Sequence, residues 1–162
     1  MTYLDTSSES TSMAASSAAA ARRGGSAPAR RRGEVIYSDW DLKTAATRVA
    51  EGLPVGILID VQRRLDLSQQ GLATLLGISE STVGRSKGGG RLSAGVSERA
   101  LRVARLAEYA AHVLGGPEEA RAWMKELNYA LGDEAPLDLA RTEPGARLVE
   151  RVLHDIEHGL PA

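Results

Sequence analysis

The chain of 162 residues contains no cysteine and no phenylalanine, and aromatic residues make up only 4% of it. Without cysteine it can form no disulfide, no thiolate nucleophile and no thiolate metal site, a composition that fits a cytoplasmic protein. The scarcity of aromatic residues leaves Leu, Val, Ile and Ala to form the core, which favours packed helices over strands. No stretch approaches eighteen apolar residues, so the sequence predicts no membrane span and no membrane partner.

Patterns typical of enzyme sites are also scarce. The segment His154-Asp155-Ile156-Glu157-His158 has the spacing of an inverted zinc-protease motif, but only four residues remain in which to find a third metal ligand. The run Gly88-Gly89-Gly90 is neither preceded by a strand nor closed by Gly-Lys-Ser/Thr, so it is not a phosphate-binding loop. No Ser-His-Asp arrangement or carboxylate pair stands out. We therefore expect no catalytic residues, no metal and no cofactor.

The formal net charge is only −1, but the charges are unevenly distributed. Residues 60–105 contain eight Lys and Arg against four Asp and Glu, whereas residues 106–162 contain five against eleven. Such asymmetry is a hint of nucleic acid at one end of a chain and of a different partner at the other. Solvated faces that differ by chance remain an alternative.

Composition and periodicity divide the chain into three regions. Residues 1–33 are rich in Ser, Ala, Gly and Arg, cannot bury enough apolar surface to offset ordering entropy, and are predicted to be disordered. Helical periodicity then predicts a helical domain at 34–115 and a smaller helical module at 116–162. The one strand candidate, Val35-Ile36-Tyr37, is too short to define a sheet, so the predicted fold class is all-α.

Individual helices are predicted from apolar spacing and from residues that begin or end helices. The predicted helices are Asp39–Glu51, one from Pro54 to Leu65, two short helices within 68–87, Ser97–Leu114, Pro117–Lys125 and Glu143–His158. The apolar face of the first is expected to consist of Leu42, Ala45, Ala46 and Val49. Thr142 is expected to cap the last helix, and Gly159 to follow its end.

Residues 68–83 have the spacing of a DNA-binding helix-turn-helix. Ser68 is suited to cap the first helix, Ala73 is small where two helices cross, and Gly77 stands where a left-handed residue makes the turn. Ile78 and Val83 are expected to be buried. The alternatives are an ordinary helical hairpin, or a motif kept for packing that no longer reads DNA.

The outward side chains of this motif are the predicted DNA contacts. Base edges are assigned to Glu80, Ser81, Thr82 and Arg85 at the start of the second helix, and phosphates to Gln69, Lys87 and Arg91. Ser79, which is expected to cap this helix, completes the set. Gly84 inside the second helix costs about 1 kcal/mol relative to Ala, and the glycine run after it loosens the exit.

Several segments carry a family resemblance. They are Arg85, Arg91-Leu92-Ser93, Ser97 to Arg105, Ala120 to Met124, Asn128, Leu131-Gly132, Pro136-Leu137, Thr142 with Gly145, and Leu153 to Pro161. In order and spacing, residues 52–161 resemble the Xre/MbcA/ParS-type antitoxins, which are paired with RES-domain toxins. The resemblance covers about two thirds of the chain and implies an Xre-like helix-turn-helix domain followed by a toxin-binding module.

The resemblance implies a type II antitoxin that binds and neutralises an NAD-consuming or ADP-ribosylating RES toxin, encoded by the neighbouring gene, by covering its active site. Autoregulation through operator DNA and a homodimer or higher oligomer are also expected. The candidate toxin-binding residues are Trp123, Asn128, Leu131, Val149, Glu150, Leu153, Glu157, Gly159, Leu160 and Pro161. For Trp123, an interface anchor and a core residue are equally open. The alternative function is a stand-alone helix-turn-helix repressor with a C-terminal dimerisation region.

Overall fold

The computed structural model describes residues 37–85 and 89–160, and within them the all-α prediction is confirmed. The described residues form eight α-helices, one 3-10 turn and no strand. In chain order these are α1 Leu42–Glu51, α2 Gly56–Leu65, α3 Gln69–Leu76, α4 Glu80–Arg85, α5 Ala94–Leu114, α6 Pro117–Lys125, η2 Tyr129–Leu131, α7 Pro136–Leu139 and α8 Glu143–Glu157. The predicted disordered tail at 1–33 and most of the strand candidate lie outside these residues.

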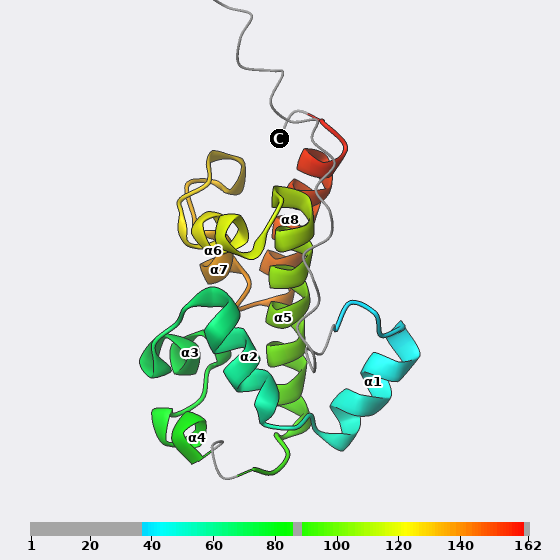
Figure 1. Cartoon of the computed structure of the whole chain (residues 1–162), viewed down its shortest axis with the longest axis vertical. Coiled ribbons are helices and arrows are strands. Elements are labelled where there is room, and N and C mark those ends of the chain that lie inside the picture. The colour runs from blue at the N-terminus through cyan, green and yellow to red at the C-terminus, as the bar shows by residue number, and fades with distance from the viewer. Residues whose placement is uncertain (1–36, 86–88, 161–162) are drawn as a thin grey trace, which may run out of the picture.

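Helix α5 is the axis of the molecule, and most other helices pack on it (Figure 1). Its 21 residues contact α1, α2 and α3 near one end and α6 and α8 near the other. Small and branched side chains on α5 are fully buried, among them Ala100, Val103, Ala104 and Ala110. Alanine lets the backbones of neighbouring helices approach closely. The helices packed on α5 therefore share one continuous hydrophobic core.

Three arginines of α5 bind backbone carbonyls of other elements. Arg99 Nε donates to Leu76 O at 2.7 Å, at the end of α3, and Arg102 Nε donates to Ala140 O at 3.4 Å, just after α7. Arg105 Nη2 donates to Trp40 O at 2.6 Å, ahead of α1. Carbonyls at the C-terminal ends of helices lack partners within the helix, so Arg99 and Arg102 supply them at α3 and α7, while Arg105 holds the segment ahead of α1.

The basic excess of residues 60–105 is thus largely used inside the fold. Further internal bonds join Arg64 to Glu108, Arg63 to Asp60, and Arg91 to Gly52 O. The hint of nucleic acid drawn from this excess therefore loses much of its force, because most of these cations have partners within the chain. The DNA hypothesis then rests on the helix-turn-helix itself.

The local signals of the helix-turn-helix are confirmed. Ser68 Oγ accepts from Gly71 N at 2.9 Å, and Gly77 has the left-handed φ of +60°. Ala73 and Val83 are buried, whereas Ile78 is only partly buried. The packing of these two helices is therefore that of a helix-turn-helix, positioned by α2 and α5.

Three helix starts and one apolar face differ from the predictions. Helix α2 begins at Gly56, so Pro54 lies ahead of the helix, in an isolated bridge with Arg91. Helix α1 begins at Leu42, because Asp41 caps it by accepting from Thr44 N at 2.7 Å. Leu42 is 82% exposed and Ala46 is also exposed, so the predicted inward face was wrong at these positions. Helix α5 begins at Ala94 rather than Ser97. Ser97 is instead fully buried, and its Oγ accepts from Leu53 N at 2.8 Å.

The remaining end signals agree with the sequence. Thr142 caps α8 by accepting from Gly145 N at 3.2 Å, and Pro136 begins the short helix α7. No helix within the described ranges is long and apolar enough to cross a membrane.

Candidate functional site

The first candidate surface is the start of α4 in the helix-turn-helix. Glu80 and Ser81 are exposed and Thr82 is half-buried, so the predicted base-reading residues lie at the surface. Ser79 caps the helix: its Oγ accepts from Thr82 N at 3.2 Å and lies 2.9 Å from Ser81 Oγ. Gln69 Nε2 donates to Glu80 O at 2.9 Å, which braces α3 against the start of α4.

The basic residues assigned to DNA are distributed differently. Arg85 is the last residue of α4, and Lys87 lies outside the described residues. Arg91 donates through Nη1 to Gly52 O at 2.6 Å, so part of its guanidinium holds the chain after α1. The structure therefore brings together the hydroxyl and carboxylate groups of the motif on one short helix, while Arg91 stands apart from it.

The second candidate surface is formed by α6, η2, α7 and α8. Trp123 is partly buried and packs against the core, which favours its interpretation as a core residue. Asn128 shapes the turn, because its Oδ1 accepts from Ala130 N at 2.9 Å. Leu131 is 9% exposed and anchors that turn to the core. These three residues position the surface more than they form it.

The apolar stripe of α8 faces the interior. Val149 and Leu153 have no exposed surface and lie in the core where α8 packs on α5. The expectation that these two side chains contact a partner is therefore corrected: in this fold they offer a partner no area. Glu150 on the same helix is exposed, and Ile156 near its end is 37% exposed.

Glu157 lies in a polar cluster at the ends of α5 and α8. Its carboxylate accepts from Tyr109 Oη at 2.8 Å and lies 3.4 Å from His112 Nε2. The Tyr109 hydroxyl holds the pKa of Glu157 below its usual range, aided by the nearby histidines. Burial and then this bond raise the pKa of Tyr109 to about 12.

The two histidines of the zinc-protease-like motif stack on each other. The rings of His154 and His158 have centroids 4.1 Å apart, and His158 Nδ1 lies 2.8 Å from His154 O. No cluster of three or more potential metal ligands occurs among the described residues.

Replacing Tyr109 with phenylalanine is expected to raise the pKa of Glu157 towards that of an ordinary glutamate. The reason is that the hydroxyl hydrogen-bonds the charged carboxylate and so favours it. A lowered folded pKa stabilises the protein above the unfolded pKa, and this contribution disappears as the pH falls through the folded pKa. NMR titration of Glu157 in both proteins measures the change. Identical titration curves would contradict the assignment.

The chain leaves α8 through a defined turn. Gly159 has a φ of +66° and donates to Ile156 O at 3.2 Å, while Leu160 N donates to Asp155 O at 2.8 Å. These two bonds form a Schellman motif, in which glycine takes the left-handed position. Leu160 is 52% exposed, and Pro161 lies outside the described residues. The turn thus ends α8 and leaves the Leu160 side chain at the surface.

Two protein-family models match the stretches of sequence that contain the two candidate surfaces. Residues 44–105 match the antitoxin Xre-like helix-turn-helix domain, and residues 110–159 match the antitoxin Xre/MbcA/ParS C-terminal toxin-binding domain. The antitoxin Xre of Photorhabdus laumondii subsp. laumondii is 32% identical over 112 residues, covering 68% of this chain and 76% of that protein. The chain belongs to the Xre/MbcA/ParS antitoxin family.

The fold of this family is also found among solved structures. One match is to a chain of the M. tuberculosis MbcT–MbcA toxin–antitoxin complex, with a TM-score of 0.53 and 23% identity. It covers 67% of this chain and 96% of that chain. The present Xre-family chain is therefore an antitoxin of a toxin–antitoxin system, and its named relatives are antitoxins rather than enzymes.

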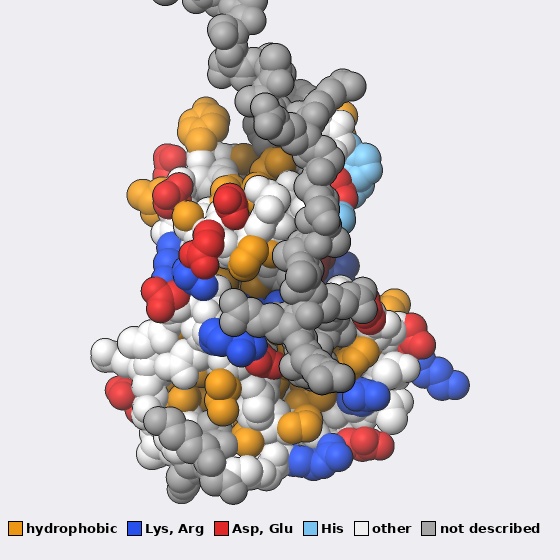
Figure 2. All heavy atoms as spheres, in the orientation of Figure 1, with side chains coloured by type: hydrophobic (Ala, Val, Ile, Leu, Met, Phe, Trp, Pro, Cys, Tyr) orange, Lys and Arg blue, Asp and Glu red, His pale blue; other side chains and the backbone are white. Residues whose placement is uncertain are grey.

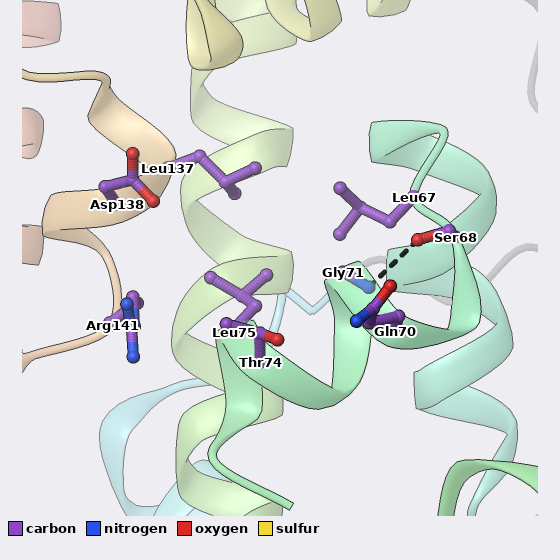
Figure 3. Close-up of a pocket in the computed structure, with 9 residues that line it drawn as sticks. All are labelled: Leu67, Ser68, Gln70, Gly71, Thr74, Leu75, Leu137, Asp138 and Arg141. Carbon is purple, nitrogen blue, oxygen red and sulfur yellow. Dashed lines mark hydrogen bonds between the residues drawn. The ribbon is translucent and has the colours of Figure 1, made fainter. Parts of the chain in front are cut away.

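A groove lies between the helix-turn-helix and the C-terminal region of this Xre-family antitoxin. Its volume is 370 Å³, and its walls are α3 on one side and α7 with the following turn on the other (Figure 3). Gln70, Thr74 and Leu75 face Leu137 and Arg141 across it. The lining is mainly apolar with a few polar groups and no pair suited to acid–base catalysis, so it is a seam between modules.

Two exposed residues of the antitoxin were missed in the sequence. Leu127 is 75% exposed and Tyr129 is 89% exposed, on either side of Asn128 in the connection between α6 and α7. The signal available was a pair of large apolar residues flanking an asparagine turn. Without the tertiary structure they are indistinguishable from core residues.

Proposed function

We propose that this antitoxin neutralises a RES-domain toxin of a type II system by covering its active site, and that it represses its own operon. The observation that carries the toxin part is the match of residues 110–159 to a toxin-binding domain, on a module in which α8 is followed by the exposed Leu160.

Charge supports an active-site-covering role. A RES toxin consumes or transfers from NAD, and a site for an anionic dinucleotide attracts negative charge with basic groups. Glu150 and Glu157 on α8 are exposed and acidic, and the exposed Leu160 follows them in the chain. An acidic helix end followed by an apolar tail is suited to compete for such a cleft.

The exposed start of α4 supports operator binding. Helix-turn-helix proteins place this end of the second helix in the major groove and pair across two half-sites as dimers. Glu80, Ser81, Thr82 and Arg85 are the residues proposed to face bases, and Gln69, Lys87 and Arg91 are proposed to lie towards phosphates. Ser79 belongs to the same surface as the cap of the helix. The proposal therefore includes a homodimer that binds palindromic DNA.

The test is co-expression of the chain with the protein encoded by the neighbouring gene. Rescue of growth arrest together with a purified complex supports the antitoxin–RES pairing. If the neighbouring protein is not toxic, no complex forms and the chain binds the operon's promoter DNA specifically, the stand-alone repressor becomes the better account of its function. Binding should be measured at several salt concentrations, because phosphate contacts make it salt-dependent.

Deleting residues 159–162 is expected to leave the fold intact and to weaken toxin binding at least about tenfold, a loss of about 1.4 kcal/mol. These residues lie beyond α8 and contribute no buried side chain among those described. Calorimetric titration with the toxin measures the loss. Because the deletion also removes the backbone bonds of Gly159 and Leu160, Leu160→Ala serves as a second variant that keeps them. Unchanged neutralisation by both variants would disprove the role of the tail.

A further inference from the structure

The connection between α6 and α7, residues 126–134, exposes two large apolar side chains, Leu127 and Tyr129, which flank Asn128. Among the described residues, the three large hydrophobic side chains with the greatest exposure are Tyr129 at 89%, Leu42 at 82% and Leu127 at 75%. Two of them therefore belong to this short loop. Large apolar side chains that gather at a surface are a feature of interaction sites, and this loop supplies two of them within three residues.

The loop holds these side chains on a fixed backbone. Asn128 N donates to Glu134 O at 3.2 Å, Asp133 N donates to Asn128 O at 3.0 Å, and the Asn128 side chain caps Ala130 N. Gly132 has a φ of +73°, which closes the turn, and Leu131 anchors it in the core. A preformed loop loses little conformational entropy on binding, so its exposed groups contribute more of their contact energy to affinity.

Within the loop itself the charge is of one sign, and the preceding Lys125 donates to Asp66 O at 2.9 Å. Glu126, Asp133 and Glu134 are exposed, and residues 126–135 contain no Lys or Arg. In the space-filling view, acidic and hydrophobic groups lie together over the α6–α7 end of the molecule (Figure 2). An apolar centre within an acidic rim complements an apolar pocket edged by Lys and Arg.

We propose that this loop is a docking element for the toxin, with Tyr129 and Leu127 entering an apolar pocket on the toxin that is edged by basic side chains. The inference rests on the proposed toxin-binding function and adds a contact separate from α8 and its tail. The loop lies within residues 110–159, which match a toxin-binding domain.

A second copy of the chain is the less suitable occupant. A two-fold contact places the same patch on both partners, so the acidic rims would face each other. Like charges brought together at an interface oppose association. A basic partner avoids this repulsion, and a protein that binds an anionic dinucleotide carries such basic groups.

The experiment measures binding of the purified neighbouring toxin to the full chain and to three variants by titration calorimetry. Tyr129→Ala is expected to raise the Kd about 30-fold, the effect of losing a central aromatic contact. Leu127→Ala is expected to raise it about tenfold. Leu42→Ala is the matched control, because Leu42 is equally exposed but lies on α1, away from the loop (Figure 1). Its Kd should equal that of the unsubstituted chain.

The possible outcomes distinguish a failure of the loop proposal from a failure of the proposed toxin-binding function. If the unsubstituted chain binds the toxin and both loop variants bind it equally well, the docking role is disproved while the toxin-binding function stands. If the unsubstituted chain fails to bind, the proposed function fails first. If the loop variants abolish a homodimer but leave toxin affinity unchanged, the loop is a self-association surface and the proposal is overturned. Thermal unfolding of the variants should match the unsubstituted chain, since both side chains are exposed.

Discussion

Replacing Gly145 with alanine is expected to destabilise the antitoxin by about 3 kcal/mol or more, because the position has no room for a side chain. Gly145 is buried in the first turn of α8, where its amide donates to the cap Thr142. A Cβ there would overlap Leu139 O at the end of α7 and lie 2.8 Å from the Leu139 carbonyl carbon. Both atoms are backbone, so relief requires α7 and α8 to separate.

Thermal unfolding measures this effect, with an expected fall in Tm on the order of 10 °C. Gly56→Ala is the matched control: Gly56 opens α2, and a Cβ there would meet nothing within 4 Å. That variant should be unchanged or slightly more stable, because alanine favours a helix over glycine. A Gly145→Ala protein as stable as the control would contradict the close α7–α8 contact.

Leu153→Ala is expected to cost about 2–5 kcal/mol of stability, the range for leucines in a packed core. Leu153 is fully buried where α8 meets α5. The substitution leaves a cavity that this helix pair can only partly close. If Leu153 instead contacted the toxin directly, the variant would remain stable and lose only affinity.

Chemical denaturation of the free chain distinguishes these roles. A lower denaturation midpoint with an unchanged m-value identifies a core residue. Glu150→Ala is the comparison on the same helix, because Glu150 is exposed and its loss should hardly alter stability. Equal stability of the Leu153→Ala and unsubstituted proteins would contradict the core position of Leu153 and favour a direct contact with the toxin.

Local signals in the sequence predicted the helical elements well. Asp41, Ser68 and Thr142 are residues whose side chains accept bonds from the first turn of a helix, and glycines such as Gly77 adopt the left-handed conformation that ends one. These interactions join residues only a few positions apart. The helix-turn-helix and its family resemblance were therefore visible in the chain alone.

The sequence predicted less well which apolar residues lie in the core and which lie at the surface. The apolar spacing of α8 predicted one hydrophobic face correctly, but the same pattern fits a helix that packs on its own chain or on a partner. Val149 and Leu153 proved to face α5. Leu42 shows the converse, because its spacing suggested burial and yet α1 leaves it exposed.

The sequence by itself determined the fold class, the helix-turn-helix and the antitoxin family, because these depend on residue types at fixed local spacings. Only the tertiary structure decided what the arginines of α5 do and which apolar residues remain at the surface. Arg99 reaches Leu76 O and Arg102 reaches Ala140 O, partners far away in sequence. Tyr129 is exposed because its loop turns away from the core that holds Leu131. Such contacts follow from how helices pack against each other, and no local spacing specifies that.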